Sequence, residues 1–209
     1  MKKEEIVRKG YDQIAPHFSV FRSQFSNEQE LDYLCGLIPE NSKILDVGCG
    51  NGIPVARYFV RKGYNVIGVD ISEKMLELAR KNVPKAKFYL YDMNDLDFED
   101  ASFHAITALY SLFHVPKEKH LTILKNFHRM LKPKGILFFC VGTLEGDDLS
   151  TFLGNIEMFW SNYSPEKTKE LVKTAGFRLL SGEILDRGDE LQFWVFAQKQ
   201  YVHPNNVSE

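Results

Sequence analysis

Three closely spaced glycines beside an aspartate are the residues of this 209-residue chain whose types and spacing most clearly indicate a binding function. They lie in the segment Ile-Leu-Asp-Val-Gly-Cys-Gly-Asn-Gly, residues 44–52. Because glycine lacks a Cβ atom, the backbone N–H groups of such a loop can approach a ligand closely. We expect Gly48, Gly50 and Gly52 to line a site at the carboxyl edge of a parallel sheet. The alternative is a tight turn without a ligand.

The spacing of these glycines indicates the kind of ligand. A dinucleotide-binding fingerprint has the pattern G-x-G-x-x-G, and its third glycine would fall at Ile53. The chain instead has G-x-G-x-G, with Asp46 two residues before it. A carboxylate repels a pyrophosphate but attracts an ammonium or sulfonium group. The pattern therefore disfavours a nucleotide-dependent oxidoreductase and favours a cationic ligand.

Residues 46–52 resemble the first motif of the class I S-adenosylmethionine-dependent methyltransferases, and residues 66–72, 91–103 and 109–114 are similar to later motifs of this family. The resemblance implies S-adenosylmethionine as cofactor and S-adenosylhomocysteine as product. It also implies an enzyme that transfers the methyl group to a small-molecule acceptor by in-line displacement, which mainly requires alignment of the reacting atoms. The alternatives are a non-catalytic regulatory module that binds S-adenosylmethionine and a methyltransferase that acts on a macromolecule.

The resemblance further implies roles for single residues of the cofactor site. Asp70 would bond both ribose hydroxyls, and Ile71 would pack on the adenine. Asp92 would contact the adenine amino group, and the backbone of Met93 would contact a ring nitrogen. Leu109 would line the methionine end of the cofactor.

The remaining candidates are aromatic residues and one histidine. Tyr11 and Phe18 lie in a segment that in similar methyltransferases folds over the cofactor as a lid, so Tyr11 is expected to bind the cofactor, although ordinary helix packing is the alternative. Tyr110 and His114 are the catalytic or acceptor-positioning candidates, because histidine titrates near neutrality and a tyrosine hydroxyl can donate or accept; pocket-wall packing is the alternative. Trp160 lies where acceptor-binding insertions often occur, or it is a core aromatic residue.

The elements that must position these residues follow from the hydrophobic pattern. Short apolar runs alternate with helical patterns from residue 43 onwards, which is typical of successive βαβ units. Strands are predicted at residues 43–47, 65–70, 86–91, 105–109, 135–141, 177–185 and 191–198. Helices are predicted between Pro54 and Gly63, from Ser72 to Pro84, from Pro116 to Pro133 and from Ser164 to Gly176.

These elements predict an α/β fold with a doubly wound, mostly parallel seven-stranded sheet that ends in an antiparallel hairpin, preceded by an N-terminal helical cap. The expected division is a cap or lid at residues 1–40, a Rossmann-like methyltransferase domain at residues 41–200 and a C-terminal tail at residues 201–209.

The composition of the chain limits the kinds of ligand and partner that are expected. Lys and Arg together number 26 and Asp and Glu 28, so the net charge of −2 gives no general attraction for nucleic acid, and a small-molecule acceptor is the better expectation. No apolar run approaches the roughly 18 residues of a membrane span. The beginning of the chain lacks an apolar secretory segment, which predicts a cytoplasmic protein. The three cysteines and the histidines lack metal-site spacing, so no metal is expected. A monomer or a homodimer is expected.

Overall fold

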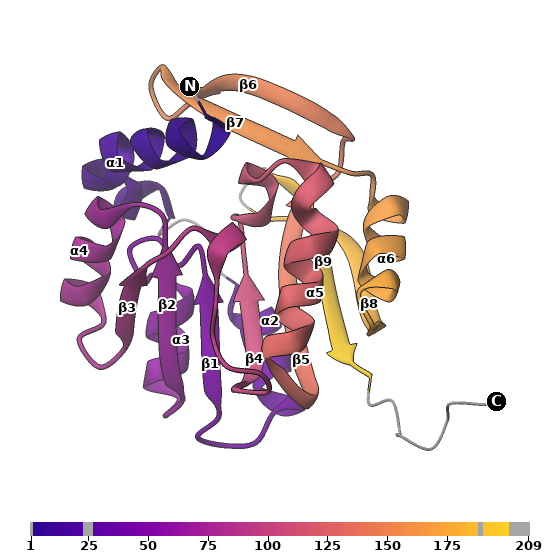
Figure 1. Ribbon diagram of the computed structural model, residues 1–209. Helices are drawn as coiled ribbons and strands as arrows, with labels where there is room; N and C mark the ends of the chain where they lie inside the picture. The colour runs from indigo at the N-terminus through magenta and orange to yellow at the C-terminus, as the bar shows by residue number, and fades with distance from the viewer. Residues whose placement is uncertain (1, 23–26, 188–189, 201–209) are drawn as a thin grey trace.

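A seven-stranded sheet forms the centre of the computed structural model, which describes residues 2–22, 27–187 and 190–200 (Figure 1). Its strands are β1 (Lys43–Val47), β2 (Asn65–Asp70), β3 (Lys87–Leu90), β4 (Phe103–Ala108), β5 (Leu131–Gly142), β8 (Phe177–Asp186) and β9 (Leu191–Lys199). Their order in the sheet is β3-β2-β1-β4-β5-β9-β8. Strands β1 to β5 are parallel, and β9 is antiparallel to both of its neighbours. The predicted fold class is confirmed.

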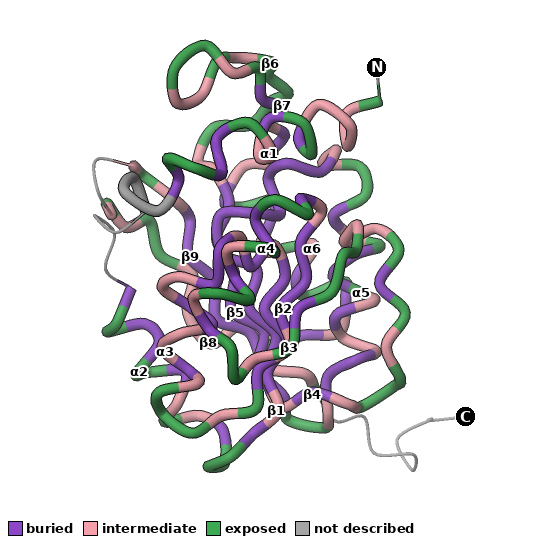
Figure 2. The backbone as a smooth tube through the Cα atoms, turned by 90° about the vertical axis from the view of Figure 1, so that its left-hand side faces the viewer, coloured by how far each residue is buried: buried purple, intermediate pink, exposed green. Residues whose placement is uncertain are grey.

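Helices cover both faces of this sheet. They are α2 (Glu28–Leu37), α3 (Val55–Arg61), α4 (Glu73–Asn82), α5 (His120–Met130) and α6 (Pro165–Thr174). The first three bury Leu31, Phe59 and Leu76 in one apolar cluster, whereas α5 and α6 bury Phe127 and Val172 in another. Figure 2 shows the strands as the buried interior, with the exposed segments on the outside.

The predicted helix boundaries are confirmed where a capping side chain sets them. The Ser72 hydroxyl accepts a hydrogen bond from Met75 N at 3.1 Å and caps α4, and the Ser164 hydroxyl accepts one from Lys167 N at 3.3 Å and caps α6. The prediction is wrong at both ends of the helix expected from Pro116 to Pro133. A short 3-10 helix over Lys117–Lys119 precedes α5, and α5 ends at Met130, so Pro133 lies in β5.

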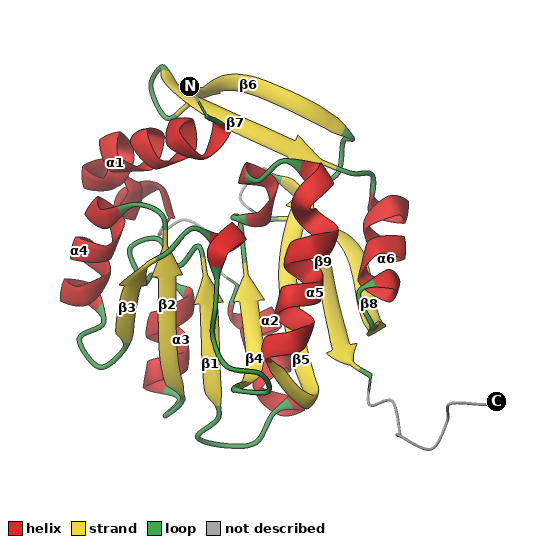
Figure 3. Ribbon diagram, in the orientation of Figure 1, coloured by secondary structure: helices red, strands yellow, loops and turns green. Residues whose placement is uncertain are grey.

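A second layer lies above the carboxyl edge of the sheet (Figure 3). It consists of α1 (Lys3–Arg22) and of a two-stranded antiparallel sheet, β6 (Gly146–Phe152) and β7 (Ile156–Asn162). We call this layer the roof. Helix α1 buries Val7 against Met158 and Phe159 of β7. Further along the helix, Ile14 and Phe18 pack with Met75 of α4, so the roof is attached to the sheet domain through apolar contacts.

The β6–β7 hairpin is the main feature of the fold that the sequence pattern does not predict. Most side chains of β6 are exposed, so this strand lacks the apolar alternation by which strands are recognised. The Gly154-Asn155 pair in the turn is a sequence pattern that could have indicated a hairpin, because such pairs are common in hairpin turns. Both residues have positive φ angles in the structure.

The described residues of the N-terminal segment form mainly two helices, which agrees with the predicted helical character, but the two helices differ in position. Helix α1 lies in the roof, whereas α2 packs against α3 and β5 in the body of the domain. The division at residue 40 stays a prediction, and the proposed tail at residues 201–209 lies outside the described residues. No helix in the described part of the chain is both long enough and apolar enough to cross a membrane.

Candidate active site

A cavity lies between the carboxyl edge of the sheet and the roof, and almost all predicted site residues line it. They are Tyr11, Asp46, Gly48, Gly50, Asp70, Ile71, Asp92, Met93, Leu109, Tyr110 and His114. Gly52 is the exception. A Cβ atom at Gly52 would lie 3.0 Å from Val83 and 3.4 Å from Phe88, so this glycine allows close packing of the loop against its neighbours and does not line the cavity.

The glycine loop, residues 48–52, is held by backbone hydrogen bonds. Gly48 N and Cys49 N both donate to Val69 O, at 2.8 and 3.0 Å. Gly48 and Gly50 have φ angles of 70° and 52°, in the left-handed region that favours glycine. A Cβ atom at Gly48 would also lie 2.2 Å from the Cβ of Ser111. The loop therefore requires glycine at position 48 for protein packing alone.

Asp70 connects the glycine loop to α4. One oxygen of its carboxylate accepts a hydrogen bond from Gly50 N at 2.8 Å, and the other accepts one from Ser72 N at 2.9 Å. Burial raises the pKa of Asp70 to about 6, although both backbone hydrogen bonds act in the opposite direction. The carboxylate is thus placed at the end of β2 and at the cavity wall.

Asp46 has a buried oxygen atom without a partner. Its Oδ1 atom accepts a hydrogen bond from the Thr107 hydroxyl at 2.8 Å, whereas no group among the described residues bonds its Oδ2 atom. Burial raises the pKa of Asp46 to about 7. A cationic group in this part of the cavity would stabilise the ionised carboxylate. Thr107, one strand away on β4, is a partner that sequence reasoning missed.

Asp92 and Met93 lie where the chain leaves β3. The Asp92 carboxylate accepts a hydrogen bond from Asn94 N at 2.8 Å and caps a 3-10 helix over Met93–Asp95. Both Asp92 and Met93 line the cavity. The capping bond also satisfies the alternative role of a turn residue, so a ligand contact at Asp92 stays a prediction.

His114 is held by two hydrogen bonds that define its protonation. Its Nδ1 atom lies 2.7 Å from Phe159 O, and its Nε2 atom lies 2.8 Å from the Tyr11 hydroxyl. Because a carbonyl only accepts, Nδ1 carries the proton, and Nε2 accepts from Tyr11. Burial lowers the pKa of His114 to about 4, so the imidazole is neutral near neutral pH. This contact joins α1 to the segment after β4.

The contacts of Tyr110 are mainly packing contacts, unlike the two side-chain hydrogen bonds of His114. Its backbone has a φ angle of 54°, and its N–H group donates to the Cys140 sulfur at 3.1 Å. Its ring meets the edge of Trp194 at a centroid distance of 5.5 Å. Leu109, the preceding residue, is also buried. These contacts agree with a cavity wall, and catalysis by Tyr110 stays a prediction.

Aromatic residues of the roof complete the cavity. The ring centroids of Trp160 and His114 are 4.6 Å apart, and those of Phe152 and Trp160 are 5.6 Å apart. Trp160 was predicted as either an acceptor-binding or a core residue. It lines the cavity and is partly buried. Phe152 and Phe113 were missed, because aromatic residues at these positions cannot be distinguished from core residues by sequence alone.

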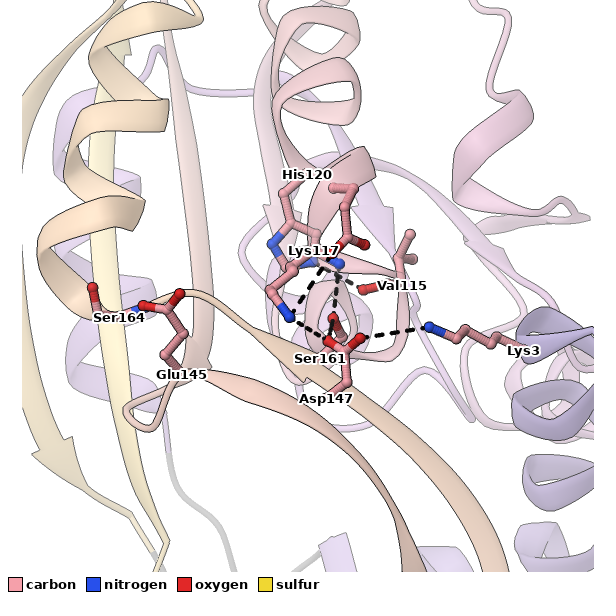
Figure 4. A network of polar contacts seen from close by, with 9 residues as sticks. Lys3, Val115, Lys117, His120, Glu145, Asp147, Ser161 and Ser164 are labelled. Carbon is pink, nitrogen blue, oxygen red and sulfur yellow. Dashed lines mark hydrogen bonds and ion pairs between the residues drawn. The ribbon is translucent and has the colours of Figure 1, made fainter.

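An ionic network attaches the roof hairpin to the body of the protein (Figure 4). Asp147 on β6 accepts hydrogen bonds from Lys117 Nζ and from the Ser161 hydroxyl, each at 2.7 Å. The Ser161 hydroxyl also accepts one from Lys117 N at 2.7 Å, and Lys3 of α1 lies 3.6 Å from Asp147. The bonds from Lys117 and Ser161 lower the pKa of Asp147 to about 2.

The charged side chains that line the described part of the cavity are all acidic. The described lining residues include five acids, which are Glu4, Asp46, Asp70, Asp92 and Glu190. None of the described lining residues is a lysine or an arginine.

Cys49 also lines the cavity. Burial raises the pKa of the Cys49 thiol well above its ordinary value, so this residue is a packing group and not a thiolate.

The arrangement defines a class of protein. The first strand ends in a glycine loop, the second ends in an acid bound to that loop, and the loop after the third strand supplies a second acid. Residues 44–135 match the family model described as a methyltransferase domain. Together with the doubly wound sheet, this match shows that the chain contains a methyltransferase domain with the sheet order expected for class I S-adenosylmethionine-dependent methyltransferases.

Individual proteins show the same relationship. The candidate methyltransferase YqeM of Bacillus subtilis (strain 168) is 29% identical over 192 residues, which is 86% of this chain and 77% of that protein. The 27-O-demethylrifamycin SV methyltransferase of Amycolatopsis mediterranei (strain S699) is 37% identical over 114 residues, or 51% of this chain, and the match spans only 41% of that relative.

A solved structure shows the same fold over most of the chain. The structure of an S-adenosylmethionine-dependent methyltransferase from Methanosarcina mazei matches this chain with a TM-score of 0.71 and 24% sequence identity. The match covers 80% of this chain and 97% of that structure. At this identity the likeness shows the fold alone.

Proposed function

We propose that the chain transfers the methyl group of S-adenosylmethionine to a small-molecule acceptor, and that both bind in the cavity beneath the roof. The observation that carries this proposal is that residues from separate segments, chosen from the sequence as cofactor contacts, line one cavity. Cavities at the carboxyl ends of parallel strands are the usual ligand sites of doubly wound sheets. The A. mediterranei relative, whose name describes a small-molecule acceptor, supports the same class of substrate.

The lining residues fit a cationic cofactor. The Oδ2 atom of Asp46 is buried without a partner among the described residues, and a buried carboxylate oxygen gains most from a positive charge. When bound, S-adenosylmethionine supplies an activated methyl group on a sulfonium sulfur. The acids of the wall and the absence of lysine and arginine from its described part favour such a ligand over a pyrophosphate.

Separate parts of the cavity would hold separate parts of the cofactor. We assign the ribose hydroxyls to Asp70, the adenine to Ile71, Asp92 and Met93, and the amino-acid end to Asp46 and to the loop backbone at Gly48 and Gly50. Asp70 suits this role because charge-assisted hydrogen bonds from hydroxyls to a buried carboxylate are strong. Leu109 would lie beside the methionine end.

The roof would exclude water from the reacting atoms. A methyl transfer by in-line displacement requires alignment within about 3–3.5 Å and no dedicated nucleophile on the enzyme. Water exclusion strengthens the electrostatic interactions inside the cavity. Phe18 of α1 and Phe152 and Trp160 of the hairpin line the cavity from the roof side. We therefore propose α1 and the hairpin as a cover over the bound cofactor.

Calorimetric titration tests the cofactor assignment. S-adenosylmethionine and S-adenosylhomocysteine are expected to bind with one-to-one stoichiometry, and NAD is expected not to bind. Folded protein that shows no binding of either adenosyl compound up to about millimolar concentration would contradict the proposal. Binding of both without transfer to any acceptor would instead favour a non-catalytic S-adenosylmethionine-binding module.

A further inference from the structure

One part of the cavity beneath the roof has flat aromatic walls beside the hydrogen-bonded pair of Tyr11 and His114. The rings of Phe113 and Trp160 lie 4.7 and 4.6 Å from the His114 ring, and Phe152 meets Trp160 edge to face. Aromatic walls of this kind pack best on a planar ligand, through offset-stacked or edge-to-face contacts. The Tyr11 hydroxyl, which comes from the roof, and the His114 imidazole, which follows β4, both line this part of the cavity and are hydrogen-bonded to each other.

The hydrogen bonds of this pair have a defined direction. Because His114 Nδ1–H donates to Phe159 O, the basic nitrogen of the ring is Nε2, and the Tyr11 hydroxyl donates to it. A hydroxyl group of a ligand that donates to the Tyr11 oxygen would extend this chain. Its proton would move to Tyr11 while the proton of Tyr11 moves to His114, so the neutral imidazole would act as a base through the tyrosine hydroxyl.

Charge restricts the ligand further. A carboxylate or phosphate on the ligand would lose water and meet acids in this cavity, without a cationic partner among the described lining residues. Glu4, the acid of the wall that lies on α1, is paired with Lys119 at 2.9 Å. An aliphatic amine would enter as a cation, and the surrounding acids would favour its protonated and therefore unreactive form. An uncharged ligand avoids both costs.

We propose that the methyl acceptor is an uncharged planar compound whose nucleophile is an ionisable hydroxyl group on an aromatic or conjugated ring, that the Tyr11 oxygen accepts a hydrogen bond from this hydroxyl, and that its proton is passed through Tyr11 to His114. The inference rests on the methyl transfer proposed above and names its substrate class. It also places Tyr11 on the acceptor side of the cavity, whereas the sequence suggested a cofactor contact.

The step balances without another reactant. The oxygen–hydrogen bond of the acceptor breaks, and its proton is passed by Tyr11 to His114 Nε2. An oxygen–carbon bond forms with an electron pair of the acceptor oxygen, and the carbon–sulfur bond breaks with its electron pair on sulfur. The positive charge lost at sulfur reappears on the imidazolium, so the net charge of the cavity is unchanged. The imidazolium then releases its proton to water.

Binding of matched compounds tests the substrate class. A cresol, a naphthol and a hydroxycoumarin are titrated against the complex of the protein with S-adenosylhomocysteine, each beside the analogue with an added carboxylate and the analogue with a cationic aminomethyl group in place of the hydroxyl. We expect at least one neutral phenol to bind, about tenfold or more tightly than its carboxylate analogue. Labelled S-adenosylmethionine is expected to methylate that phenol and not the corresponding amine.

The outcomes separate two failures. Equal or tighter binding of the carboxylates, transfer to the amines, or no binding of any phenol by protein that binds S-adenosylhomocysteine would overturn the acceptor class and leave the cofactor site standing. Failure to bind S-adenosylhomocysteine would overturn the proposed function itself.

Two variants test the polar pair. Tyr11→Phe and His114→Gln are expected to lower kcat/KM for the phenol about 100-fold or more while the dissociation constant of S-adenosylmethionine changes little. Without the base, only acceptor that is already ionised reacts, so the kcat/KM of His114→Gln should rise with pH, whereas that of the wild type should be nearly flat above about pH 5. A more acidic, nitro-substituted phenol should restore most of the lost rate.

Matched changes outside the cavity provide the controls. Tyr89→Phe removes a hydroxyl from an exposed tyrosine of β3, and His17→Gln changes an exposed histidine of α1. Both should keep wild-type rates and a wild-type pH profile. If Tyr11→Phe and His114→Gln lose activity equally with acidic and ordinary phenols and keep a flat pH profile, the pair is structural and the proposed proton path is wrong.

Discussion

The floor and the roof of the cavity are held by different kinds of interaction. The floor, which consists of the glycine loop with the ends of β1 and β2, is joined by backbone hydrogen bonds and by the buried carboxylates of Asp46 and Asp70. The roof is attached to the body by apolar contacts and by surface ion pairs such as Lys117–Asp147 and Lys119–Glu4. Exposed ion pairs are weak, whereas buried backbone bonds are costly to break.

This difference indicates a division of labour. A floor built from buried backbone contacts holds one geometry, which suits recognition of a cofactor of constant shape. The roof also has buried contacts, but its ion pairs are exposed and cost little free energy to break, so we expect the roof to open more easily than the floor; opening is required for a covered ligand to enter and leave. The variants below are arranged to break the floor first and the roof last.

The largest effect is expected for Gly48→Ala in the floor. The new Cβ atom would lie 2.2 Å from the Cβ of Ser111, and the φ angle of 70° disfavours alanine. Overpacking and the left-handed conformation together should lower the free energy of unfolding by about 2–5 kcal/mol, measured by urea denaturation. Gly36→Ala is the control, because Gly36 lies in α2 with no atom within 4 Å of the added Cβ, and a small stabilisation is expected.

Gly50→Ala separates packing from ligand contact in the same loop. A Cβ atom at Gly50 would make only an ordinary contact of 3.5 Å with Phe18, so the loss of stability should be limited to the cost of its left-handed φ angle, about 1–2 kcal/mol. A further loss of S-adenosylmethionine affinity per folded molecule would show that the cofactor lies against this glycine. Unchanged affinity per folded molecule would place the cofactor elsewhere.

The floor was largely predictable from the sequence, and the roof was not. Strands β1 and β2 have the predicted boundaries, because a short apolar run that ends at a glycine loop or at an acid before a helix cap is a local signal. By contrast, Tyr11 and His114 are 103 positions apart, and no periodicity links them. The β6 strand is polar and exposed, so its position depends on partners in α1 and after β4. Long-range side-chain contacts of this kind leave no pattern in a single sequence.

Asp70→Asn is the next test of the floor. Replacement of the carboxylate should weaken S-adenosylmethionine binding about tenfold or more, because charge-assisted hydrogen bonds to the ribose are lost. The amide keeps one acceptor oxygen for the loop, so the variant should stay folded. Asp100→Asn is the matched control, since Asp100 is an exposed acid paired with Arg129 at 2.6 Å. Wild-type affinity in folded Asp70→Asn would mean that Asp70 only joins the loop to α4.

A smaller effect is expected from the titration of Asp46. Burial raises its pKa to about 7 in the ligand-free protein, and a bound cation favours the ionised form. The affinity for S-adenosylmethionine should therefore rise as the pH increases from about 6 to about 8, and Asp46→Asn should reduce this slope. The free energy of unfolding of the ligand-free protein should instead decrease as the pH rises. A folded-state pKa above the ordinary value means that ionisation between about pH 4 and pH 7 lowers the free energy of unfolding.

The smallest effect is expected in the roof, for Asp147→Asn. The substitution keeps the shape of the side chain but removes its charge, so the bond from Lys117 Nζ is weakened and the hairpin opens more often. The release of S-adenosylhomocysteine, followed by stopped-flow fluorescence, should become about two to five times faster, as expected for an ion pair that is partly exposed. The wild-type release rate should rise with salt, and that of the variant should respond less.

The roof and the floor should also differ in pH dependence, and this contrast completes the test of Asp147. Its pKa is lowered to about 2, so its stabilising charge is present above its ordinary pKa and is lost only in strong acid. Release from the wild type should therefore show no contribution from Asp147 between about pH 6 and pH 8, where Asp46 titrates in the floor. Glu170→Gln, which breaks an exposed ion pair with Lys167 on α6, is the control and should leave release unchanged. Equal release rates for Asp147→Asn and the wild type at low salt would show that the ligand leaves without opening this contact, and the hairpin would then be a fixed wall.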